Sequence, residues 1–365
     1  MRSRKEYTAE DRRRKKNGLI RKFITLCTAA AVISALLLTA SCTSGMNDSS
    51  SGTADDKLDI YFLDVGQADS TILISQGEAV LVDAGNRDDT DFITGYLGEL
   101  GIDRLKYVIF THPHEDHIGS GEAVVDNFQI DKIFMLDEYD DGIEGQLSRT
   151  ITEAGIDTEA PEPGDTVHFG ECTIEFLGPY RNYDSTNDDS ICLKVTHGKN
   201  RILFTGDAGR IPEKDMIEAG ENLEADLLQA GHHGSSTSNS YYLLRESNPE
   251  YVVISCGEGN MYGHPHEEAL SRFSDLGAEV FRTDTQGTII AESDGRELTF
   301  NCEGSKASGT HTDDYEEASY IGNLNSKKFH DPDCSGLPDE DNRVYFRTRA
   351  AAVDAGYEPC GRCRP

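Results

Sequence analysis

Short apolar runs recur along the chain from about residue 58, and most of them are bounded by Gly or Asp. Many are rich in Val and Ile, which predicts β-strands. The predicted strands cover Asp59–Asp64, Ser70–Ile74, Ala79–Val82, Tyr107–Phe110, Lys132–Leu136, Cys172–Leu177, Ile191–Val195, Arg201–Phe204, Asp226–Gln229, Tyr251–Ser255 and Gly287–Ala291.

Helical periodicity appears between some of these strands. The early strands are joined by short turns and the later ones by helices, so we expect an α/β fold of two mixed sheets flanked by helices. A simple doubly wound sheet would not show this mixture. The predicted helices cover Thr90–Leu100, Gly119–Phe128, Gly145–Ala154, Pro212–Ala219, Ser240–Glu246 and Glu267–Leu276.

The amino end has a different pattern. Residues 1–42 contain ten Lys and Arg against three Asp and Glu, and an apolar stretch from Phe23 to Ala40 ends at Ser41-Cys42. This order is typical of a secretory signal, and Cys42 resembles the lipidated cysteine of a bacterial lipoprotein. We therefore expect an exported protein held at the cell membrane by a lipid on Cys42, with an uncleaved apolar anchor or a released protein as alternatives. Residues 43–57 read as a flexible linker.

Charge narrows the candidate substrates. The whole chain has 34 Lys and Arg against 66 Asp and Glu, although its first 42 residues are basic. The remainder is therefore strongly acidic and repels nucleic-acid phosphate at long range. A phosphate substrate would need a local cation, and a metal ion is the obvious candidate.

A dense group of metal-ligand residues follows the strand predicted at Tyr107–Phe110. The segment Thr111-His112-Pro113-His114-Glu115-Asp116-His117 places three imidazoles and a carboxylate at a strand end, where α/β active sites tend to lie. Imidazole and carboxylate are ligands for Zn²⁺ or a similar ion. The residues therefore predict metal-assisted hydrolysis, for which no serine or cysteine nucleophile is needed.

This segment is the HxHxDH signature of the metallo-β-lactamase fold, and the resemblance covers residues 58–302. The chain is most similar to the branch typified by the hydrolase domain of the competence protein ComEC, whose membrane channel is absent here. Five further segments carry this resemblance: Phe62 to Ser70, Leu81-Val82-Asp83-Ala84-Gly85, Leu203-Phe204-Thr205-Gly206-Asp207, Gln229 to Ser235 and Asn260 to Pro265.

The resemblance implies roles for single residues. His112 and His114 would hold one metal ion, Asp116 and His117 another, and Asp207 would bridge both, while Asp83 would brace the site. The family usually has a further His before the bridging Asp, but this chain has Asn187-Asp188-Asp189-Ser190 there. We expect His232 or His233 to replace it, the other contacting substrate or donating a proton. His264 would close the second site.

The resemblance implies a binuclear Zn²⁺ enzyme, with Mn²⁺ as an alternative metal, that hydrolyses a phosphodiester such as DNA. Asp116 would orient the attacking hydroxide. A cell-wall phosphocholine or teichoic-acid esterase is a rival, since the acidic body suits a small headgroup better than long duplex DNA. A non-catalytic surface DNA-binding protein is a rival from another class. No protein partner can be inferred.

A polar linker, residues 303–318, precedes a small unit at 319–365. His330, Cys334, Cys360 and Cys363 supply the ligands of a structural Zn²⁺, which would stabilise a unit too small to bury much core. Disulfides are the alternative. Together with Tyr320-Ile321-Gly322-Asn323 the pattern resembles the zinc-binding domain of the DNA-repair protein Ada. His330 stands where that family has its reactive cysteine, so we expect metal binding without methyl transfer. A strand is predicted at Asn342–Phe346 and a helix at Thr348–Ala355.

Some residues are expected to have only structural roles. Four cysteines lie in or near predicted strands and should be buried free thiols, and three isolated histidines should lie at the surface. They are Cys172, Cys192, Cys256 and Cys302, and His168, His197 and His311.

Overall fold

The computed structural model describes residues 57–136, 142–306, 320–338, 343–346, 352–353, 356–363 and 365. The expected signal segment with Cys42, most of both linkers and most of the helix predicted at Thr348–Ala355 therefore lie outside the described residues. Within the described part of the chain, no helix is long and apolar enough to cross a membrane.

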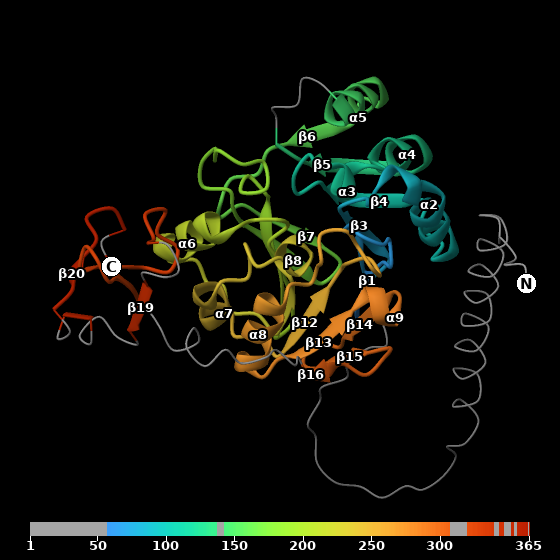
Figure 1. Ribbon diagram of the computed structural model, residues 1–365. Coiled ribbons are helices and arrows are strands. Elements are labelled where there is room, and N and C mark those ends of the chain that lie inside the picture. Colours follow the sequence, from blue (N-terminus) through green and yellow to red (C-terminus); the bar gives the residue numbers. More distant parts are fainter. Residues whose placement is uncertain are drawn as a thin grey trace, which may run out of the picture. The chain divides into compact units, whose positions relative to one another are not determined.

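Two large sheets form the body of the protein (Figure 1). The first has the strand order β15-β14-β1-β2-β3-β4-β5-β6, in which β3 to β6 run parallel. Its strands are β1 Leu58–Phe62, β2 Thr71–Ser75, β3 Glu78–Val82, β4 Arg104–Ile109, β5 Gln129–Phe134, β6 Asp157–Glu159, β14 Ile289–Ser293 and β15 Leu298–Phe300.

The second sheet has the order β16-β13-β12-β11-β10-β9-β8-β7, with β10 to β13 parallel. Residues 305–306 pair with β13, so this sheet extends into the segment predicted as a linker. Its strands are β7 Thr166–Phe169, β8 Cys172–Gly178, β9 Cys192–His197, β10 Asn200–Phe204, β11 Leu227–Gln229, β12 Tyr251–Ile254, β13 Glu279–Arg282 and β16 Ser305–Lys306.

Strand alternation builds a core of several layers. In β10, Ile202 and Phe204 face the first sheet, whereas Leu203 between them packs against helices. This is the period-two pattern of a strand buried on both faces. The ring of Phe204 stacks on that of Phe62 in β1, with centroids 6.3 Å apart. The two sheets thus share one apolar interior.

Helices cover the outer faces of both sheets (Figure 1). The predicted helices are confirmed to within a few residues, and the two mixed sheets flanked by helices are the predicted architecture. Helices α2 Thr90–Glu99, α4 Gly121–Asn127 and α5 Gly142–Ala154 pack on the first sheet. Helices α6 Arg210–Ala219, α7 Tyr241–Ser247 and α8 Glu267–Leu276 pack on the second. The shorter elements are α3 Glu115–Ile118, α9 Thr283–Gln286 and the 3₁₀ turns η2 Arg87–Asp89 and η3 Gly231–Gly234.

The C-terminal unit has a small sheet of its own, in the order β19-β17-β18-β20. Phe329 and Ala352 are fully buried in its core, and Tyr357 is nearly so. The predicted strand is confirmed at β19. The strands are β17 Tyr320–Asn323, β18 Lys328–His330, β19 Arg343–Phe346 and β20 Glu358–Pro359.

One predicted surface residue is buried. His197 is 1% exposed, and its Nδ1 lies 2.8 Å from Ser293 Oγ of the first sheet. The surface prediction for His197 was wrong because this polar side chain finds its partner across the sheet interface. His168 is exposed as expected, and His311 lies outside the described residues. Cys172, Cys192 and Cys256 are buried free thiols, as predicted, whereas Cys302 is a free thiol that is only partly buried.

Candidate metal centres

The expected ligands follow the carboxyl ends of parallel strands in both sheets. His112 follows β4 in the first sheet, while Asp207 follows β10 and His233 follows β11 in the second. Polar side chains gather at such strand ends because side chains in the loops are not packed into the sheet and can face a ligand. The apolar interior thus ends in a polar site to which each sheet contributes.

The turn between β4 and α3 gathers its own imidazoles. His112 Nε2 lies 3.1 Å from His114 Nδ1, and the rings of His112 and His117 have centroids 4.1 Å apart. His112 and His117 are fully buried, whereas His114 is exposed and its Nε2 lies 2.8 Å from Thr186 Oγ1. The HxHxDH segment therefore forms one compact face.

Asp207 lies between two groups of imidazoles. Its Oδ2 is 3.7 Å from His112 Nε2 and 3.4 Å from His232 Nε2. Its Oδ1 is 3.3 Å from His117 Nε2 and 4.0 Å from His233 Nε2. Each carboxylate oxygen thus faces a different pair of ring nitrogens, which is the arrangement needed for a carboxylate that bridges two ions.

Both histidines of the His232-His233 pair lie at the centre. His232 Nε2 is 3.4 Å from Asn187 Nδ2, so His232 lies beside the segment that lacks the usual family histidine. His233 Nε2 is 3.1 Å from Asp116 Oδ2. The sequence left open which of the two is a ligand, and the geometry fits His232 to the side of His112 and His233 to the side of Asp116 and His117.

His264 lies next to the His232-His233 pair, whose own ring centroids are 6.1 Å apart. Its ring centroid is 5.5 Å from that of His232 and 6.1 Å from that of His233, and its Nδ1 is 3.2 Å from Gln67 Nε2. Ligand atoms within 4.8 Å of one another come instead from His112, His117 and Asp207, and from Asp69, His117 and His233, among the described residues. His264, like His114, Asp116 and His232, belongs to neither of these groups, although its ring lies beside the His232-His233 pair.

Three aspartate and threonine contacts orient His117. Asp83 Oδ1 accepts a hydrogen bond from the Thr111 backbone N–H, and its Oδ2 accepts one from Thr111 Oγ1. The same Oδ2 lies 2.8 Å from His117 Nδ1, which leaves Nε2 facing Asp207. A carboxylate on the far ring nitrogen fixes the tautomer and raises ligand basicity. Asp83 is thus placed to hold the His117 ring in one orientation.

The matching support for His233 was not foreseen. His233 Nδ1 donates to the Ser255 carbonyl at 3.1 Å, and Asp69 Oδ1 lies 3.5 Å from the same nitrogen. The Asp69 backbone N–H also donates to the Asp116 carbonyl. The position of Asp69 in the Phe62–Ser70 segment was a weak signal, whereas the Ser255 contact is made by a carbonyl, which no side-chain pattern reveals.

Buried hydrogen bonds fix the loop that carries His232 and His233. His232 and His233 both have φ near 53°, a left-handed conformation that costs roughly 1–3 kcal/mol for a residue with a Cβ. Asn239 bonds both backbone groups of Gly231. Buried Glu213 accepts the N–H groups of Asn239 and Ser240, so the surrounding structure fixes the strained turn.

The protonation states of Asp207 and His112 favour the binding of a cation at this site. Burial raises the pKa of Asp207, but the imidazoles of His117, His233 and His112 outweigh burial and lower this pKa well below its usual range. Burial and the neighbouring His117 hold the pKa of His112 well below its usual value, so this ring is neutral, as a metal ligand must be.

Unsatisfied buried atoms give an independent test of the fit. His117 Nε2, Asp207 Oδ1 and Asp69 Oδ1 are buried without a hydrogen-bond partner among the described residues. A buried polar group left in this state costs roughly 1–3 kcal/mol. These atoms converge on the same centre, so the residues fit a divalent metal there.

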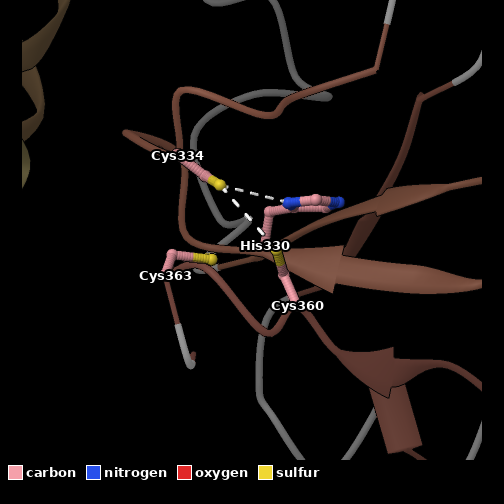
Figure 2. Close-up of side chains that lie close together, drawn as sticks. All are labelled: His330, Cys334, Cys360 and Cys363. Atoms are coloured by element: carbon pink, nitrogen blue, oxygen red, sulfur yellow. Dashed lines mark hydrogen bonds between the residues drawn. The ribbon is translucent and has the colours of Figure 1, made fainter.

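A second candidate centre lies in the C-terminal unit. Figure 2 shows the three sulfur atoms of Cys334, Cys360 and Cys363 gathered with the ring of His330. His330 Nδ1 is 3.3 Å from Cys334 Sγ, which is 4.0 Å from Cys360 Sγ. All three cysteines are free, and their ligand atoms and that of His330 lie within 4.8 Å of one another. This is the donor set of a structural zinc site, and no disulfide competes with it.

Comparison with known proteins supports both centres. The sequence model of the metallo-beta-lactamase superfamily matches residues 63–258. The chain belongs to this superfamily. The model of the metal-binding domain of Ada matches residues 305–365.

Relatives of this chain include a competence protein and a recombination protein. It is 27% identical to ComE operon protein 3 of Bacillus subtilis, over 67% of this chain and 34% of that protein. It is 29% identical to Recombination protein 2 of Haemophilus influenzae (62% and 28%) and 31% identical to Competence protein ComA of Neisseria gonorrhoeae (59% and 30%). The chain thus spans about a third of these relatives, and the predicted ComEC-like resemblance is confirmed.

The chemistry of the main centre follows from its residues. His112, His114, His232 and Asp207 would hold one ion of this metallo-beta-lactamase-fold hydrolase, and His117, His233, Asp116 and Asp207 the other. Such ions supply hydroxide at neutral pH and polarise an oxygen of the substrate. Asp116, which is partly exposed beside His233, would orient that hydroxide.

Replacing Asp83 tests the bracing role. Asp83→Asn keeps the shape of the side chain but removes the charge next to His117 Nδ1. We expect metal affinity of the main centre to fall about 10- to 100-fold, as for other outer partners of ligating histidines. Calorimetric titration of the metal-free protein with Zn²⁺ measures this. Asp88→Asn, at an exposed position of η2, is the matched control. Equal affinities of both variants and the parent would contradict the role.

Cys334→Ser tests the C-terminal centre. The variant should lose one equivalent of zinc, because a hydroxyl is a poor replacement for a thiolate ligand. Elemental analysis of the dialysed full chain measures the stoichiometry, and Cys302→Ser, at a free thiol outside the cluster, is the control. Unchanged zinc content in Cys334→Ser would contradict a metal site here.

Proposed function

We propose that this hydrolase is an exported phosphodiesterase that uses two metal ions and acts on nucleic acid. The carrying observation is the Asp207 carboxylate, whose two oxygens face separate ligand groups. Paired ions suit phosphodiesters because one activates water while both neutralise the phosphoryl oxygens. They also overcome the repulsion between an acidic protein and its anionic substrate.

DNA is the favoured phosphodiester. One relative is named as a recombination protein and another as a competence protein. The alternative is a phosphocholine or teichoic-acid esterase, which is favoured by the excess of 66 acidic over 34 basic residues. A non-catalytic DNA-binding role would not require ligands for two ions, so it ranks below both. For either hydrolase, Asp116 would orient the attacking hydroxide toward phosphorus.

His114→Ala tests the hydrolase proposal. The zinc- or manganese-loaded parent should hydrolyse bis-p-nitrophenyl phosphate, and loss of this ligand should lower kcat/KM at least about 100-fold, beyond the effect of an outer partner. Release of p-nitrophenolate measures the rate. His168→Ala, at an exposed histidine on β7, is the control. Equal rates in the parent and in His114→Ala would refute the proposal.

Cys42→Ser tests the proposed location. When the full chain is expressed in a bacterium, the parent should partition into the detergent phase because a lipid adds roughly 0.8 kcal/mol of membrane affinity per buried CH₂. The variant should lose the lipid and move toward the aqueous phase. Phase partition and mass spectrometry of the amino end measure this, with Cys27→Ser as the control. Identical partition and an unmodified Cys42 in the parent would contradict lipidation.

A further inference from the structure

A cleft of about 360 Å³ opens beside the main metal centre. Asp116, which contacts His233, forms part of its lining, so an occupant of the cleft lies next to the reacting groups. Gln67 comes from the loop after β1 and Glu115 from the start of α3. Asn86 and residues 260–262, from the loop after β12, complete the lining. The cleft is therefore placed to hold the part of a substrate attached to its reacting phosphate.

Two apolar side chains are strongly exposed at this cleft. Met261 is 89% and Tyr262 is 62% exposed, and no other large hydrophobic side chain among the described residues is as exposed as either. Isolated exposed apolar residues are ordinary, but two neighbours beside a reacting centre form a patch that a ligand can cover. Their position, and not their exposure alone, points to a binding role.

The tyrosine is held in place before any ligand arrives. Its ring lies nearly parallel to that of His264, with an interplanar angle of 24° and centroids 5.7 Å apart. Asn260 Oδ1 accepts the Tyr262 backbone N–H, and His266 Nε2 donates to the Tyr262 carbonyl. A fixed aromatic surface loses little entropy on binding. Tyr262 thus presents one flat apolar face toward solvent.

The polar groups of the cleft are already in use. Gln67 Oε1 accepts the Gly257 N–H, and its Nε2 faces His264 Nδ1. Asn260 Nδ2 donates to the carbonyls of Gly257 and His264. These amides have little capacity left to recognise the edge of a ligand. The cleft therefore offers a face for stacking more than a pattern of hydrogen bonds.

The charged side chains of the lining restrict the chemical class of ligand that can occupy the cleft. Glu115 is exposed in the lining and disfavours a second phosphate in the cleft. A quaternary ammonium group would gain from Glu115, but it is usually bound within a cage of several aromatic rings, and Tyr262 is the one aromatic side chain in this lining. A single flat face suits a flat ring.

We infer that Tyr262 and Met261 form a stacking subsite for a nucleobase attached to the phosphodiester being cleaved. The inference deepens the proposed phosphodiesterase function and rests on it. Base-aromatic stacking tolerates sequence differences because every base has a π-face. The subsite would thus distinguish nucleotide esters from simple phosphate esters without selecting one base.

The test compares three esters with the same leaving group on the metal-loaded full chain. They are thymidine 5′-(p-nitrophenyl phosphate), methyl p-nitrophenyl phosphate and p-nitrophenyl phosphorylcholine. We expect the parent to prefer the thymidine ester over the methyl ester. In Tyr262→Ala this ratio of kcat/KM values should fall about 5- to 100-fold, the range of base stacking. Tyr262→Phe keeps the ring and should keep the ratio. Ile211→Ala, an exposed apolar residue on α6, is the control.

Each outcome decides the inference. An unchanged ratio in Tyr262→Ala overturns it, and so does a selective loss on the phosphorylcholine ester, which would assign the subsite to a quaternary ammonium group. Titration with thymidine 5′-monophosphate provides a readout without catalysis, and equal affinity of the parent and Tyr262→Ala also overturns the inference. Failure of the phosphodiesterase proposal looks different, because the parent would then match His114→Ala on every ester.

Discussion

One buried carboxylate organises the molecule around its site. Each carboxylate oxygen of Asp207 faces one imidazole from the segment after β4 and one from the loop after β11. Strand β4 belongs to the first sheet and β11 to the second. A buried carboxylate among imidazoles is stable only with cationic partners. Gly206 lets the chain approach closely enough, since a Cβ there would lie 2.9 Å from Ser190 Oγ at a φ of 50°. Loops from both sheets of the sandwich therefore converge at Asp207.

Around that carboxylate, buried polar contacts set the direction of each ring. Asp83 holds His117 from the first sheet, and the Ser255 carbonyl holds His233 from the second. Glu213 and Arg272 then fix the loop behind His233 by bonding its backbone N–H and carbonyl groups. Such buried polar networks stabilise a fold only when nearly all of their donors and acceptors are hydrogen-bonded. Among the described residues, the buried atoms left without a hydrogen-bond partner include His117 Nε2 and Asp207 Oδ1, which face the centre and would be free to bind ions.

Much of this could be predicted, for reasons that also explain the failures. Val- and Ile-rich runs and the dense His112–His117 segment are local signals, and they gave the sheets and the first ligands. The strand β7 has a largely exposed sequence at a sheet edge, so its apolar signal is weak. Burial of His197 and support by Ser255 arise from contacts between distant segments. The contact of His264 with Gln67 also joins distant segments, so residue spacing does not reveal it.

The division of ligands between the sheets has a thermodynamic consequence. An ion held by His112 or His117 on one side and by Asp207 on the other would be a cross-link between the two layers, in addition to their shared apolar core and the hydrogen bonds between them. Whatever binds only the folded form stabilises it in proportion to the logarithm of its free concentration. The melting temperature of this protein is then a gauge of available metal, and a chelator acts on it as a denaturant would.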